Sequence, residues 1–337
     1  MTDREVEPAA KVTAGLRAFV RRHQTAITVV GSVTTAAVLV LVLAGRRDEF
    51  TEALSSAGLP ILGVVVLLQI VALVSRSEAW HLTIEAAGGT VARRVLYRAS
   101  SMAILGGLLN AHMAVAARIA ALRRSSPEVS PRVPTLIAAE FPILAIEATL
   151  AALASFTLIG PLGLPWWLPL VFVAVFGAAS AGLRHLALRE ARLLWMGLAV
   201  LRKLRGGSRV VGFVLLAVFA QIFRNWLTLH AVGVDASFFD AIAVLIAVVT
   251  LAQLPVGPSV GAAAAVVILG SEGVAAAAAA GLLLTVTGTI GGLTFAAWAG
   301  ADKLWSVSRW AERRRQKRAA PSAAAPDPPP EGSSARR

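Results

Sequence analysis

Charged and polar side chains inside otherwise apolar segments are the residues of this chain that could do chemistry. The segment VGFVLLAVFAQIFRNWLTLH carries Gln221, Arg224 and Asn225, whose spacing of i, i+3 and i+4 places them on one face of a helix. A charge at the centre of a spanning helix costs at least about 2.5 kcal/mol, so it needs a partner or a function. Because a guanidinium binds phosphate oxygens bidentately, Arg224 predicts a site for a phospholipid headgroup. The alternatives are that Arg224 reaches the outer surface or pairs with a carboxylate.

Two glutamates in the segment TLIAAEFPILAIEATLAALASF are the candidate partners of such an arginine. Glu140 and Glu147 lie seven residues apart on one side of a helix, with Pro142 between them. We expect Glu147 near mid-depth, paired with Arg224 or Arg118, or binding a cationic headgroup or a proton. A buried structural ion pair is the alternative. Glu140 is expected in water at the cytoplasmic edge.

A third group of polar residues, Asn110, His112 and Arg118, lies around a predicted turn. His112 could titrate near neutral pH, although a lone histidine in an apolar segment more often hydrogen-bonds a carbonyl group. Arg118 is followed by Arg123 and Arg124, and together they would form a basic cytoplasmic entrance for an anionic headgroup. A topology signal alone also explains Arg123 and Arg124.

The elements that must position these residues follow from the composition. Of the 337 residues, 57% are hydrophobic and 15% are charged, and the mean hydropathy is +0.72. A soluble domain of this length cannot bury so much apolar surface, so the sequence predicts an all-α, polytopic integral membrane protein. The net charge of +13 does not indicate nucleic acid, because the basic residues lie in short loops between apolar segments.

The order of crossings is predicted from the apolar stretches and the charges between them. Long apolar stretches lie at residues 25–44, 59–75, 99–117, 135–159, 168–183, 211–230, 241–269 and 273–300. If 99–117 and 241–269 enter and leave the membrane on one side, both termini are cytoplasmic, and all but three of the 32 Lys and Arg residues lie inside. This distribution satisfies the positive-inside rule, whereas eight simple crossings would place the basic segment 118–134 outside. We therefore predict six spanning helices and two re-entrant helical hairpins, related as inverted repeats.

The turn of the second hairpin is predicted in the segment LPVGPSVG. Pro255, Gly257, Pro258 and Gly261 each interrupt or loosen a helix. Irregular backbone at membrane depth is tolerated only where protein or a wet cavity surrounds it, so the turn predicts a binding site near the midplane. A simple helix kink is the alternative.

The chain is expected to divide into three parts. Residues 1–24 form a cytoplasmic N-terminal segment, residues 25–310 the membrane domain, and residues 311–337 a basic, proline-rich cytoplasmic tail. The tail is too polar to bury a core and is therefore expected to be disordered.

Two segments carry a resemblance to a known family: LLNAHMAVAARIAALRRSS at residues 108–126, and LPVGPSVGAAAAVVILGSEGVAAAAAAGLLLT at residues 254–285. Together with the order of elements, they resemble the flippase-like membrane domain of lysylphosphatidylglycerol synthases and its stand-alone relatives, over about residues 60 to 300. Asn110 and Arg118 match the polar break of that family's first half. The Pro/Gly-rich turn of its second half is matched by Pro255, Gly257 and Gly261.

The resemblance implies a multi-pass protein of the plasma membrane that moves lipids with charged headgroups. The lipid would be an anionic phospholipid or one linked to a polyprenyl phosphate, and the aminoacyl-transferase domain of the full synthases would be missing. The chain departs from the family at Ala120 and Ala121, which replace a Gly-Glu pair, and at Ala262 to Ala265, where a second glutamate is replaced. These losses fit an alternative function as a non-catalytic membrane partner of a lipid or cell-envelope synthase.

Motifs of catalysis, metal binding and cofactor binding are missing from the sequence. It contains no HExxH, GxSxG, Walker loop or CxxC, so we expect no enzyme activity, no metal and no cofactor. A membrane glycosyl- or prenyl-lipid transferase using Asp48 or Glu49 stays as a further alternative. The expected partners are membrane lipids rather than nucleic acid, and a homo-oligomer or an envelope-synthesis partner stays open.

Overall fold

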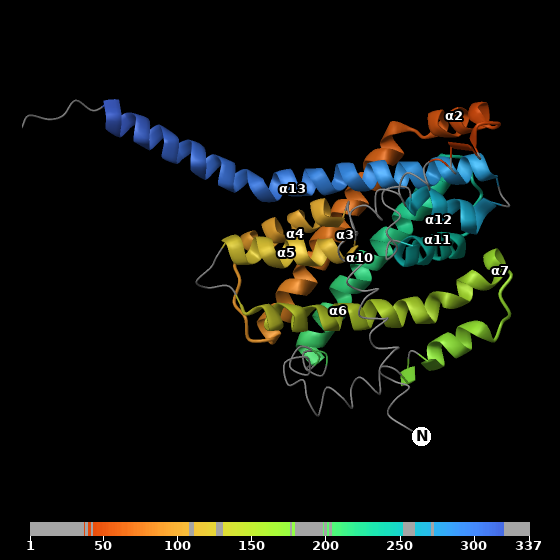
Figure 1. Ribbon diagram of the computed structural model, residues 1–337, viewed down its shortest axis with the longest axis horizontal. Coiled ribbons are helices and arrows are strands. Elements are labelled where there is room, and N and C mark those ends of the chain that lie inside the picture. Colours follow the sequence, from red (N-terminus) through yellow and green to blue (C-terminus); the bar gives the residue numbers. More distant parts are fainter. Residues whose placement is uncertain are drawn as a thin grey trace, which may run out of the picture.

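A computed structural model of the full chain gives the fold. It describes residues 37, 40, 41, 43–107, 111–125, 131–175, 177, 178, 198, 201, 204–251, 260–270 and 273–319. These residues form helices joined by turns, and no strand occurs among them (Figure 1). The predicted all-α class is confirmed for this part of the chain.

Four helices of the described residues are long and apolar enough to cross a membrane. The candidate spans are Leu59–Ala86, Val133–Leu162, Gly206–Ala231 and Val274–Ala301. They lie in α3 (Leu59–Ala86), α6 (Val133–Ala154) with its continuation through η1 (Ser155–Leu158) and α7 (Ile159–Leu162), α10 (Leu204–Ala231) and α13 (Val274–Ala319). Each span has 26 residues or more, against the ~20 that a bilayer core requires. Four of the six predicted crossings thus have a matching helix. Of the other two, 25–44 lies mostly outside the described residues and 168–183 lies partly outside them.

The outer faces of these helices carry large exposed apolar side chains, as expected of membrane helices. Large apolar side chains such as Leu67, Leu216, Phe219 and Leu293 are about half exposed. A water-soluble monomer rarely exposes so much contiguous apolar surface, because each such side chain is more stable out of water. Lipid is the solvent that these faces fit.

The centre of the fold is the antiparallel pair of α3 and α10, which pack against each other over much of their length (Figure 1). Ser56, at the end of the short helix α2 (Arg47–Ser56), donates a hydrogen bond of 3.0 Å to the carbonyl of Ala231, the last residue of α10. At the other end of α3, Trp80 shares a buried apolar cluster with Val210 and Val214 near the start of α10. The first turns of α3 therefore lie beside the last turns of α10.

Two pairs of short helices pack beside the long ones. One pair is α4 (Arg93–Gly107) and α5 (Ala111–Ser125), and the other is α11 (Phe238–Leu251) and α12 (Val260–Leu269). The longest of them have 15 residues, which is about 22 Å of helix and less than the ~30 Å hydrocarbon core. The hairpins predicted at 99–117 and 241–269 fall on these two pairs. The first pair begins and ends several residues outside the predicted bounds.

Close packing of α12 on α13 depends on glycine. A Cβ atom added at Gly281 of α13 would lie 2.3 Å from the Cα of Ala262 in α12. Gly261 faces the same contact, since a Cβ there would lie 2.8 Å from the carbonyl oxygen of Gly281. Gly261, predicted as a turn residue, instead lies in the first turn of α12, where its missing side chain lets two backbones approach.

The helix α13 continues beyond its candidate span. It runs as one helix to Ala319, and its last part extends away from the other described helices (Figure 1). Residues 311–319 are thus helical, inside the segment for which the composition predicts disorder.

Candidate functional site

The guanidinium of Arg224 in α10 is held against α3. Its Nη1 donates a hydrogen bond to Oε1 of Gln69, and Nε2 of Gln221 donates to the same oxygen at 2.9 Å. The polar face of α10 predicted from the spacing of Gln221 and Arg224 is therefore the face that meets α3. Gln69 supplies an acceptor oxygen but no negative charge.

The charge of Arg224 has no carboxylate partner among the residues that the structure describes. The ion pair that was one alternative for this residue is therefore not found in that part of the chain. The Nε of Arg224 and the Nδ2 of Asn225 are buried and make no hydrogen bond with any described residue, and Asn225 as a whole is only 1% exposed. Buried donors almost always have partners. Arg224 and its neighbour Asn225 thus each have a buried N–H donor without an acceptor among the described residues.

Glycines of α13 form the third wall of this site. A Cβ atom at Gly288 would lie 3.1 Å from Nη1 of Arg224, and one at Gly291 would lie 2.8 Å from Cγ of Gln69. At Gly291 a larger residue would push into the first atoms of the Gln69 side chain, so α13 can lie this close there only with glycine. At Gly288 it would crowd the guanidinium of Arg224. The site of Arg224 is therefore enclosed by α3, α10 and α13.

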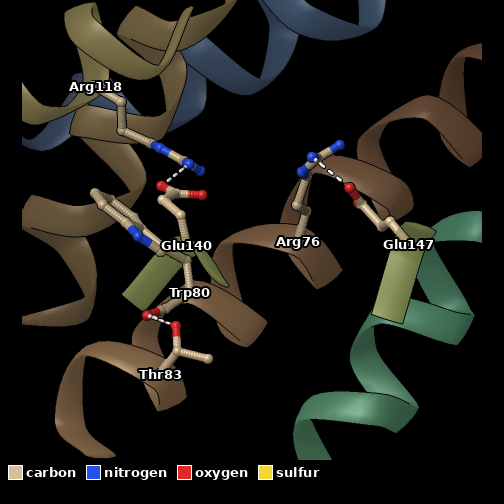
Figure 2. Close-up of polar contacts among 6 residues, drawn as sticks. All are labelled: Arg76, Trp80, Thr83, Arg118, Glu140 and Glu147. Atoms are coloured by element: carbon tan, nitrogen blue, oxygen red, sulfur yellow. Dashed lines mark hydrogen bonds and ion pairs between the residues drawn. The ribbon is translucent and has the colours of Figure 1, made fainter. Parts of the chain in front are cut away.

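A second polar cluster joins α3, α5 and α6 (Figure 2). The Nη2 of Arg118 in α5 donates to Oε1 of Glu140 in α6, and the guanidinium carbon lies 4.1 Å from the centre of the Trp80 ring. The side chains of this ion pair are 8% and 9% exposed, so the pair is closed to solvent. The prediction that Glu140 lies in water was wrong, because α5 covers it with an arginine.

Next to this closed pair lies an open one (Figure 2). Nη2 of Arg76 in α3 donates to Oε2 of Glu147 in α6 at 2.9 Å, and the two side chains are 47% and 24% exposed. Glu147 was expected to pair with Arg224 or Arg118, and the structure gives it Arg76 instead. The predicted apolar stretch ends at residue 75, yet Arg76 lies well inside α3.

A signal for Arg76 is present in the sequence. Gln69, Arg76 and Trp80 follow each other at i, i+7 and i+11, a spacing that places all three on one side of a helix. Extending the helix past residue 75 would have brought Arg76 onto the side that carries Gln69.

A third polar contact ties α3 to α4 and α13. The hydroxyl of Tyr97 donates to Oε1 of Glu78, and Nε of Arg93 lies 3.7 Å from the other oxygen of Glu78. The Tyr97 ring also contacts Phe295 and Trp298 of α13. Burial and the bond to Glu78 raise the pKa of Tyr97 to about 12.

The other predicted site residues are only partly described. Asn110, Pro255, Gly257 and Pro258 lie outside the described residues, and for His112 only its backbone in α5 is described. Asp48 and Glu49 lie exposed in the first turn of α2, where Arg46 pairs with Glu49 at 3.5 Å. The acidic pair of the transferase alternative thus lies on the surface, apart from the clusters described above.

Comparison with known proteins gives no relative. No protein-family model, curated protein or solved structure matches the chain significantly. The resemblance in sequence to the flippase-like family therefore stays a prediction, and function rests on the residues themselves.

Proposed function

We propose that this chain is a flippase-like protein of the plasma membrane that binds anionic phospholipids and moves them between the two leaflets. The observation that carries the proposal is the guanidinium of Arg224, which lies in a candidate spanning helix and has no carboxylate partner among the described residues. An unneutralised cation at that depth is costly, so a function that supplies an anion accounts for it.

Phosphate is the anion that fits this group. A guanidinium offers donors in a planar fork that matches phosphate oxygens, and the buried Nε of Arg224 has no acceptor among the described residues. A hydrogen bond to a charged group contributes about 1.5–3 kcal/mol. The phosphate of a membrane lipid can enter between the helices while its acyl chains stay in the bilayer. A lipid linked to a polyprenyl phosphate offers the same chemistry.

The re-entrant topology belongs to the same proposal. The pairs α4–α5 and α11–α12 would enter the membrane from opposite faces and would turn within it, with both termini in the cytoplasm. Support comes from their lengths, since helices of 10 to 15 residues do not cross a bilayer singly. The absence of a Walker loop favours movement that is passive or coupled to an ion gradient.

Lipid movement in vesicles tests this proposal. Purified protein is reconstituted with fluorescent phosphatidylglycerol, and the fraction that a membrane-impermeant quencher bleaches is followed in time. We expect the intact chain to speed the exchange between leaflets, and Arg224→Gln to slow it about tenfold or more, since one charged hydrogen bond is worth that factor.

The matched control is Arg209→Gln, which removes an exposed arginine from the same helix. This variant is expected to move the lipid as fast as the unchanged protein. Equal rates for the unchanged protein and Arg224→Gln would show that the site is not used.

A further inference from the structure

The helix α3 carries polar groups of three different clusters on one side. Gln69 contacts Arg224, Arg76 contacts Glu147, and Trp80 lies under Arg118. Seven residues separate Gln69 from Arg76, which is about 10.5 Å along the helix. The site of Arg224 and the ion pair of Arg76 are thus two turns apart along one helical side.

The two ion pairs beyond Gln69 differ in how open they are. Arg118 and Glu140 are closed, whereas the side chain of Arg76 is 47% exposed and that of Glu147 24% exposed, although both lie in candidate spans. Charged groups in spanning segments face the interior or a water-filled cavity rather than lipid tails. About half of the Arg76 side chain is thus open to an incoming group.

From this arrangement we propose that Arg76 is a second binding station for the phosphate of an anionic phospholipid, which takes the place of the Glu147 carboxylate on the guanidinium. Because the ligand is taken to be a phospholipid, this station rests on the proposed function. No covalent step is involved: one anion leaves the guanidinium and another replaces it, while the freed carboxylate keeps its contact with water.

The openness of the Arg76 pair is what makes the exchange feasible. Partly solvated ion pairs are weakly held, whereas a buried pair is costly to open because each charge is then left without a partner. The Arg118–Glu140 pair, with Trp80 against its guanidinium, is of the second kind. We therefore expect the phosphate to bind at Arg224 and at Arg76. We do not expect it to displace Glu140 from Arg118.

The test counts tightly bound lipid by native mass spectrometry. The full chain, stripped of lipid in detergent, is incubated with phosphatidylglycerol, and the number retained is corrected for retention of a neutral galactosyl diacylglycerol. The variant is Arg76→Gln combined with Glu147→Gln, which removes both charges together and leaves no unpaired ion that could unfold the protein. We expect this double variant to retain one phosphatidylglycerol molecule fewer than the unchanged chain.

The matched control is Arg46→Gln combined with Glu49→Gln, which neutralises an exposed ion pair on α2. It should retain as much lipid as the unchanged chain, and equal melting temperatures of both double variants show that they are folded. Unchanged retention in the Arg76 and Glu147 variant would overturn the second station.

Arg224→Gln in the same measurement separates the two proposals. Loss of lipid in the Arg76 and Glu147 variant but not in Arg224→Gln would leave the second station standing and overturn the role of Arg224. Inorganic phosphate is the last probe. If it were retained by the unchanged chain and lost in the double variant, the site would belong to a soluble anion and not to a lipid.

Discussion

At the scale of single residues, the buried ion pair of Arg118 and Glu140 is the contact whose loss should lower the free energy of unfolding most. Glu140→Gln leaves the guanidinium buried without its anion, and we expect the free energy of unfolding in mixed micelles to fall by about 3–5 kcal/mol. Replacing both residues by methionine removes the unpaired charge and should recover most of that loss. Glu49→Gln, which breaks an exposed pair, should change it by less than about 1 kcal/mol. Similar losses for Glu140→Gln and Glu49→Gln would contradict the burial of Arg118.

Tyr97 allows a pH prediction at the same scale, because it is the only tyrosine of the chain and its ionisation can be followed by ultraviolet absorption. Its pKa is raised from 10.0 to about 12, first by burial and then by the bond to Glu78. The folded state thus favours the neutral phenol. This stabilisation is complete below pH 10 and is lost as the pH rises through about 12.

Two variants of opposite sign check the cause of this shift. Glu78→Gln removes a neighbouring negative charge, so the pKa of Tyr97 should fall but should stay above its ordinary value, since burial remains. Arg93→Gln removes a positive charge that lowers the pKa, and should therefore raise it. Shifts in the same direction for both variants would rule out this electrostatic account.

At the scale of elements, glycine sets how closely α13 approaches its neighbours. Gly281→Ala would place a Cβ atom 2.3 Å from the backbone of α12, and we expect the free energy of unfolding to fall by about 1–3 kcal/mol. The control is Gly63→Ala in α3, where an added Cβ atom would have no other atom within 4 Å. It should stabilise the chain by about 0.5–1 kcal/mol, because alanine is the better helix former. Stabilisation by both would show that α12 and α13 are not in close contact.

At the scale of the whole molecule, the charge distribution predicts which loops lie on which side. The chain has no cysteine, so single cysteines can be introduced at Ser125 and Ser271 and labelled with a membrane-impermeant maleimide. We expect Ser125→Cys to react only from the cytoplasmic side and Ser271→Cys only from outside. Reaction of Ser125→Cys from outside in intact cells would favour eight simple crossings and remove the re-entrant hairpins.

The sequence by itself determined the class of the molecule and its most unusual charge. Long apolar runs stand out because a helix must be both long and apolar to cross lipid, so α3, α6, α10 and α13 each match a predicted stretch. Arg224 stands out for the same reason, since any charge inside such a run is costly. Both features can be recognised within one short segment of the sequence, without knowing which segments pack together.

Only the tertiary structure decided which charges meet. Glu147 and Arg76 are 71 residues apart in the chain, and Glu140 and Arg118 are 22 apart. Nothing local in the sequence links such positions. The apolar stretch ends at residue 75, yet α3 continues to Ala86, because its second half is buried against other helices through residues such as Trp80. Packing between distant segments, and not hydropathy, therefore fixed the partners of Glu140 and Glu147 and left Arg224 without a carboxylate among the described residues.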